Sequence, residues 1–171
     1  MEATFQAVIS KFDDSLWPFH VKVPEDIYQS FADQKIKRVL MQINDSEKMH
    51  AGFISEGNRK YFLKLSKVVM KKFHLAVDQN VEVKIEKDTT KYGMPISEEM
   101  KELLELDPEG EAFFHKLTPG KIRSLLHLVN TFKSSDKRIE KSVIIMEHLK
   151  ANYGKLDWKM LNEAFKNGPM I

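Results

Sequence analysis

The six histidines are the side chains best able to bind a metal ion or transfer a proton near neutral pH. They stand at positions 20, 50, 74, 115, 127 and 148. None lies two, three or four residues from another, the spacing that places two imidazoles on one face of a strand or helix. The chain has no cysteine, which excludes thiolate ligands and cysteine nucleophiles. The sequence therefore predicts no metal site and no cofactor.

Carboxylates gather at two places, Asp13-Asp14 and residues 97–111, and the second stretch has seven acids and one lysine. Adjacent acids fit a turn, and acids in a first helical turn face the positive end of the helix dipole. The chain contains neither a phosphate-binding glycine loop nor a Gly-x-Ser-x-Gly nucleophile turn. These residues identify no catalytic group, and they favour a protein that is not an enzyme.

A basic segment follows, because residues 118–150 hold seven lysines and arginines against three acids. Its apolar spacing predicts two helices, and the first turns of a helix offer free backbone N–H groups and a positive dipole end to an anion. We predict four candidate anion-binding residues in these turns: Lys121, Arg123, Lys137 and Arg138.

The alternative interpretation is a helical hairpin whose lysines stay solvated. Its apolar stripe would then pack on the β-barrel that is predicted for the first half of the chain. Asp136 and Glu140 would repel phosphates, and the interleaved aromatic residues typical of single-strand binding are almost absent. The hairpin is therefore favoured over a nucleic-acid partner, which a salt-dependent binding assay would test. Residues 1–115 carry a net charge of −4 and residues 116–171 one of +6, which also fits attraction between parts of one chain.

The first half of the chain alternates apolar and polar residues at the period of β-strands. Two short helices, over 24–33 and 66–74, interrupt the strands. We predict an α+β fold, with a small barrel of five to seven short, mostly antiparallel strands over residues 1–92. Side chains usually fill so small a barrel. If it encloses a pocket, five residues are predicted to line it: Trp17, Phe19, Met41, Phe53 and Tyr61.

From residue 95 the apolar residues recur at helical spacing, which predicts a helical region over 95–171. The joint between the two parts falls near residues 90–96. Six side chains of the basic helices are predicted to be buried: Ile122, Leu126, Val129, Ile139, Val143 and Met146.

Several segments resemble a known pair of domains. The stretches "FHVKVPEDI", "RVLMQIN", "YFLKLSKVV" and "AVDQNVEVKIEKD" are similar to a barrel domain of unknown function. The stretch "HKLTPGKIRSLLHLVNTFKSSDKRIEKSVIIMEHLK" resembles the YdeI/OmpD-associated, bacteriocin-protection domain that often follows that barrel. The resemblance covers residues 4–150 and implies tolerance to bacteriocins or antimicrobial peptides. It implies no catalytic residue.

The N-terminus lacks the basic and apolar regions of an export signal, and no apolar run approaches the roughly 20 residues of a membrane span. Together with the missing cysteines, this predicts a cytoplasmic protein. The predicted function is non-enzymatic binding or stress tolerance, through a protein or small-molecule partner. Two alternatives remain: a small-molecule enzyme with a barrel pocket near His20 or His50, and weak nucleic-acid binding by the basic helices.

Overall fold

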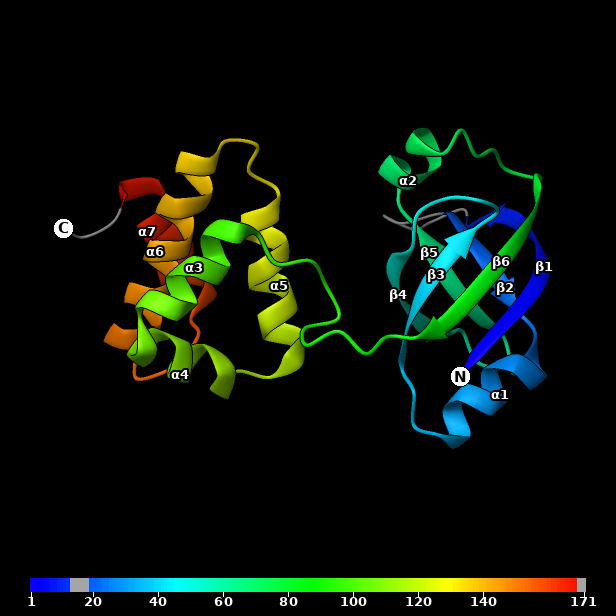
Figure 1. Cartoon of the computed structure of the whole chain (residues 1–171), viewed down its shortest axis with the longest axis horizontal. Coiled ribbons are helices and arrows are strands. Elements are labelled where there is room, and N and C mark those ends of the chain that lie inside the picture. Colours follow the sequence, from blue (N-terminus) through cyan, green and yellow to red (C-terminus); the bar gives the residue numbers. More distant parts are fainter. Residues whose placement is uncertain (13–18, 169–171) are drawn as a thin grey trace. The chain divides into compact units, whose positions relative to one another are not determined.

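The computed structural model of the protein describes residues 1–12 and 19–168. The chain divides into two compact units, Met1–Thr89 and Thr90–Ile171 (Figure 1). Each unit has a buried apolar cluster of its own. Among the helices in the described residues, none combines the length and the apolar character needed to cross a membrane.

The first unit is a closed barrel of six strands, in the order β1-β2-β5-β4-β3-β6 around the barrel. All the neighbouring strands pair antiparallel. The strands are β1 (Glu2–Lys11), β2 (Phe19–Val23), β3 (Arg38–Ile43), β4 (Met49–Ser55), β5 (Tyr61–Leu65) and β6 (Asn80–Lys87). The predicted α+β fold, with an antiparallel barrel before a helical region, is confirmed.

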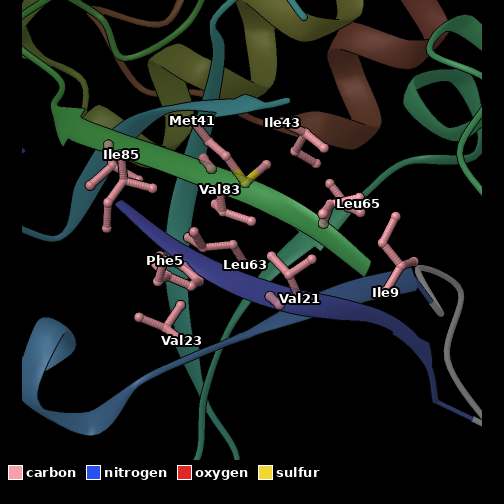
Figure 2. Packing of buried hydrophobic residues seen from close by; sticks show 14 of the residues in the cluster. Phe5, Ile9, Val21, Val23, Met41, Ile43, Leu63, Leu65, Val83 and Ile85 are labelled. Carbon is pink, nitrogen blue, oxygen red and sulfur yellow. The ribbon is translucent and has the colours of Figure 1, made fainter. Parts of the chain in front are cut away.

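Apolar side chains fill the barrel, as Figure 2 shows. In β6, Val81, Val83 and Ile85 are at most 2% exposed, while the residues between them face outward. The strand register places Phe5 opposite Val83 and Met41 opposite Ile85. Because side chains alternate between the two faces of a strand, this register brings the apolar set of every strand into the same interior.

A short helix lies at each end of the barrel, α1 (Glu25–Asp33) at one and α2 (Lys67–Lys72) at the other (Figure 1). Phe31 of α1 is fully buried against the barrel core, and Met70 of α2 is 7% exposed in the same cluster. Both helices therefore cover apolar side chains that the open ends of the barrel would expose to water.

The second unit contains, within the described residues, five helices. They are α3 (Glu98–Leu106), α4 (Pro108–Lys116), α5 (Pro119–Asn130), α6 (Ser135–Ala151) and α7 (Trp158–Asn167). The residue before each helix accepts a hydrogen bond from a first-turn backbone N–H through its side chain. These caps satisfy donors that a helix leaves unpaired, so the boundaries of the helices are set locally.

The burial of α6 differs from the prediction. Ile122, Leu126, Val129 and Met146 are buried as predicted, but Val143 is only half-buried and Ile139 is 49% exposed. The helix contacts α3, α4, α5 and α7, so its buried residues extend around much of its circumference. Ile139 and Val143 were wrongly predicted to be buried, because they lie four residues apart on the face of α6 opposite the buried Lys141 and His148.

Candidate functional site

The residues predicted to line a barrel pocket lie in different surroundings. Trp17 lies outside the described residues. Met41 is 1% exposed and belongs to the filled interior, and Phe19 packs half-buried against it. Phe53 and Tyr61 both contact the ring of Tyr28 in α1, and Phe53 also lines a surface hollow of about 360 Å³. Ligand binding by this set stays a prediction.

The two barrel histidines named as possible reaction centres differ in their contacts. His20 is 5% exposed, stacks on Phe12 with ring centroids 3.7 Å apart, and meets the edge of Phe62. The Nδ1 of His50 lies 2.8 Å from the Oδ2 of Asp88, whose side chain is 1% exposed. A carboxylate that holds Nδ1–H leaves Nε2 able to accept a proton. The contact with Asp88 orients the His50 ring, and a reaction at either histidine stays a prediction.

Two of the four candidate anion-binding residues are held by acids of their own unit. Lys137 Nζ lies 2.7 Å from Glu140 Oε2. The Arg138 guanidinium donates to both carboxylate oxygens of Glu99, at 2.9 and 2.7 Å, and to two backbone carbonyls before α6. Arg138, with a neighbouring serine hydroxyl, lowers the pKa of Glu99 to about 2. An anion that bound Arg138 would therefore have to compete with Glu99.

Lys121 and Arg123 lie on α5, whereas Lys137 and Arg138 lie on α6. Lys121 is exposed and Arg123 half-buried, and neither has an ion-pair partner among residues 1–12 and 19–168. These two are the cations of the predicted set that remain available to a ligand. Binding of nucleic acid or another anion by the four residues stays a prediction.

A groove between α6 and α7 is a candidate site that the sequence did not indicate. It has a volume of about 280 Å³. Its lining, called the α6–α7 groove below, is formed by Ile144, Glu147, His148, Ala151, Asn152, Met160, Ala164, Asn167 and Gly168. Ile144 is 2% exposed, whereas Met160 is 49% exposed. Small alanines on both helices leave room between the walls, and the groove is largely apolar.

His148 connects the two walls of the groove. Its side chain lines the groove, and its Nε2 accepts a hydrogen bond of 3.1 Å from the backbone N–H of Asp157. The Asp157 side chain in turn caps α7 by accepting from two backbone N–H groups. Burial lowers the pKa of His148, against the smaller opposing effect of the Asp157 carboxylate. The imidazole is therefore neutral near pH 7 and able to accept this bond.

Lys141 makes a second polar contact between α6 and α7. It is 7% exposed, and its Nζ donates to the backbone carbonyl of Phe165 at 2.8 Å and to Glu140 at 2.7 Å. The ammonium also lies 5.2 Å from the centroid of the Phe165 ring, within reach of a cation–π contact. The groove therefore has two anchored walls, and its shape is set before any ligand binds.

A chain of charges borders the groove on the α4 side. Lys150 Nζ lies 2.8 Å from Glu147 Oε1 and 2.9 Å from Asp107 Oδ2. Burial alone would raise the pKa of Asp107, but the Gly110 N–H and the Lys150 ammonium bring it below its ordinary value. The two carboxylates share one ammonium, so this border carries a net negative charge.

The burial of His148, which lowers the pKa of its imidazole, predicts that acid weakens the helical unit. Unfolded His148 takes up a proton near pH 6.5, whereas the folded residue does so only at lower pH. Between these values the unfolded state binds more protons, so the free energy of unfolding is constant above about pH 6.5 and falls as the pH decreases toward the folded pKa. We expect urea unfolding of the full chain between about pH 8 and 5 to show this loss.

The slope should disappear in a His148→Gln variant, which cannot take up that proton. His127→Gln is the matched control, because His127 is an exposed histidine of the same unit. An equal acid dependence in the wild type and His148→Gln proteins would contradict the assignment.

Together these features define a class of protein: a closed antiparallel barrel joined to a helical unit that has a preformed, largely apolar groove. Residues 5–85 match a family model described as a domain of unknown function (DUF1905). Residues 94–152 match one described as bacteriocin-protection, YdeI or OmpD-associated. The two matches follow one another along the chain in the predicted order, and the predicted resemblance to these two domains is confirmed.

The comparisons with curated proteins and with solved structures gave no match. The second family match ends at residue 152, whereas α7 begins at Trp158. One wall of the α6–α7 groove therefore lies beyond the matched region.

Proposed function

We propose that the chain is a non-enzymatic, cytoplasmic binding protein that raises tolerance to antimicrobial peptides through contact with a protein or small-molecule partner. The observation that carries the proposal is the α6–α7 groove, whose α6 wall lies within the residues that match the bacteriocin-protection model. The absence of cysteine from the sequence supports a cytoplasmic site of action.

The polar groups of the groove support binding over catalysis. His148 Nε2 accepts from the Asp157 N–H, and the Glu147 carboxylate is paired with Lys150. A general base needs a lone pair that can reach the substrate proton. His148 thus links the two walls and Glu147 is held by Lys150 within α6, and the apolar residues of the lining offer contact area to a ligand.

A tolerance assay tests this function. A strain from which the gene is deleted should be inhibited by a bacteriocin or cationic antimicrobial peptide at a lower concentration than its parent. Wild-type protein should restore tolerance, whereas Ala164→Trp should not, because an indole would occupy the groove. Ala112→Trp is the matched control, since Ala112 is an exposed alanine of the same unit and should restore tolerance fully. Equal tolerance in the deletion strain and its parent would overturn the proposal.

The His50–Asp88 pair carries a second candidate function, a small-molecule enzyme on the outer face of the barrel. The pair lies beside a surface hollow of about 480 Å³, whose lining includes Lys48 and Leu40, and Leu40 pairs with His50 across the strands. The same assay separates the two functions. Loss of tolerance in His50→Ala and Asp88→Asn, with full tolerance in Ala164→Trp, would favour the enzyme.

A further inference from the structure

The size of the α6–α7 groove restricts its ligand. Its volume of about 280 Å³ lies just below the roughly 300–1,000 Å³ of pockets that enclose small molecules. A cavity of about 150 Å³ is known to hold a benzene ring. The groove therefore accommodates one large side chain, or two smaller ones, of a ligand that continues outside it. A peptide segment with an apolar anchor is such a ligand.

The lining suits the apolar face of a helix. Met160 is half exposed in the groove, and a methionine side chain adapts to anchors of different shape. A groove between two packed helices that offers several apolar contacts is a common binding site for an amphipathic helix.

The charge of the groove selects a cationic ligand. Glu147 is the charged residue of the lining, and the lowered pKa of His148 keeps that imidazole neutral near pH 7. Glu147 also shares the Lys150 ammonium with Asp107, so the carboxylates outnumber the cation. A lysine or arginine that approached Glu147 would relieve this imbalance, whereas an acidic ligand would be repelled.

We propose that the α6–α7 groove binds the apolar face of a cationic amphipathic peptide helix, with one large apolar side chain between Ile144 and Ala164 and a cation at Glu147. This proposal rests on the function proposed above and names its ligand class. Most of the affinity comes from the apolar anchor. The Glu147 carboxylate discriminates between peptides of opposite charge.

Fluorescence anisotropy with the full chain tests the proposal. The probe is a labelled peptide of roughly 18 residues, about five helical turns, with leucines on one face and lysines on the other. Ala164→Trp should weaken its binding by about tenfold or more, because the anchor loses its space. Glu147→Gln should weaken binding by less, and mainly at about 50 mM salt, since about 200 mM salt screens the pair. Ala112→Trp should bind as the wild type does.

Several results would overturn the proposal. These are no binding of the peptide to the wild type, equal binding to Ala164→Trp, and binding no tighter than that of a leucine–glutamate peptide of the same pattern. Because Ala164→Trp could disturb packing, Met160→Lys provides a second variant at a half-exposed position, and it should repel the same probe. If the groove instead held a second copy of the chain, Ala164→Trp would change the oligomeric state on size exclusion, which would also overturn it.

The binding assay and the tolerance assay separate the two proposals. Groove-dependent tolerance without binding of the lysine–leucine peptide would reject the ligand class and leave the proposed function standing. Groove-dependent binding without any change in tolerance on deletion of the gene would reject the function and support the site.

Discussion

A Phe114→Ala variant is expected to lose about 3–5 kcal/mol of the free energy of unfolding of the helical unit. Phe114 in α4 is fully buried in the apolar cluster of that unit. Its ring meets the edge of Tyr92, with centroids 6.3 Å apart. Truncation to alanine removes this apolar contact and leaves a cavity that the neighbouring helices fill only in part. The loss approaches the whole stability of many small domains.

Hydrogen exchange measured by mass spectrometry on the full chain would locate this loss. Peptides from residues 90–168 should lose protection, and peptides from the strands of the barrel should not, because the two units have separate apolar clusters. Phe113→Ala is the matched control, since Phe113 is only half-buried and should cost less. Equal loss of protection in both units would contradict the separation of the two cores.

The barrel could be predicted because its signal is local. Alternation along a strand such as 80–87 fixes which side chains face inward, and any closed antiparallel arrangement must gather that set in one interior. The starts of the helices were equally readable, because a capping side chain acts within three residues of its own position. Ser97 and Thr118 both accept from the N–H three residues ahead.

The candidate groove could not be predicted, because it depends on how two helices pack. The spacing of Met160 and Ala164 shows only that both lie on one face of α7. Whether that face meets α6 tightly or leaves a groove depends on long-range contacts such as Lys141 with the Phe165 carbonyl. The small size of Ala151 and Ala164 is a local signal, but it does not show whether another side chain fills the space beside them.

The charge asymmetry of the sequence has a visible structural meaning in the helical unit. The acidic stretch 97–111 supplies Glu99 and Asp107, and the basic helix α6 supplies Arg138 and Lys150. These residues form the Glu99–Arg138 and Asp107–Lys150 pairs. The sequence favoured attraction within the chain as the explanation of the asymmetry. It could not predict which residues pair, because Arg138 lies 39 residues from Glu99.

A Gly110→Ala variant is expected to lose about 2–4 kcal/mol, the sum of an overpacked core and a lost helix cap. The added Cβ would lie 2.5 Å from the Oδ2 of Asp107 and 3.1 Å from the Sδ of Met146. The Asp107 side chain cannot simply turn away, because its Oδ1 accepts from the Gly110 N–H at 3.0 Å and its Oδ2 binds Lys150. Relieving the clash therefore breaks the cap of α4 and the ion pair that borders the groove.

Gly120→Ala is the matched control for this substitution. Gly120 lies in the first turn of α5, and a Cβ added there would have no atom within 4 Å. Alanine at such a position should raise the free energy of unfolding by about 0.4–1 kcal/mol, because it restricts the unfolded chain. Urea unfolding of the two variants should therefore shift in opposite directions. Gly110→Ala should also weaken binding of the lysine–leucine peptide, because Lys150, released from Asp107, would then neutralise Glu147 alone. A Gly110→Ala protein as stable as the wild type would show that the contacts with Gly110 and Lys150 do not fix the Asp107 side chain.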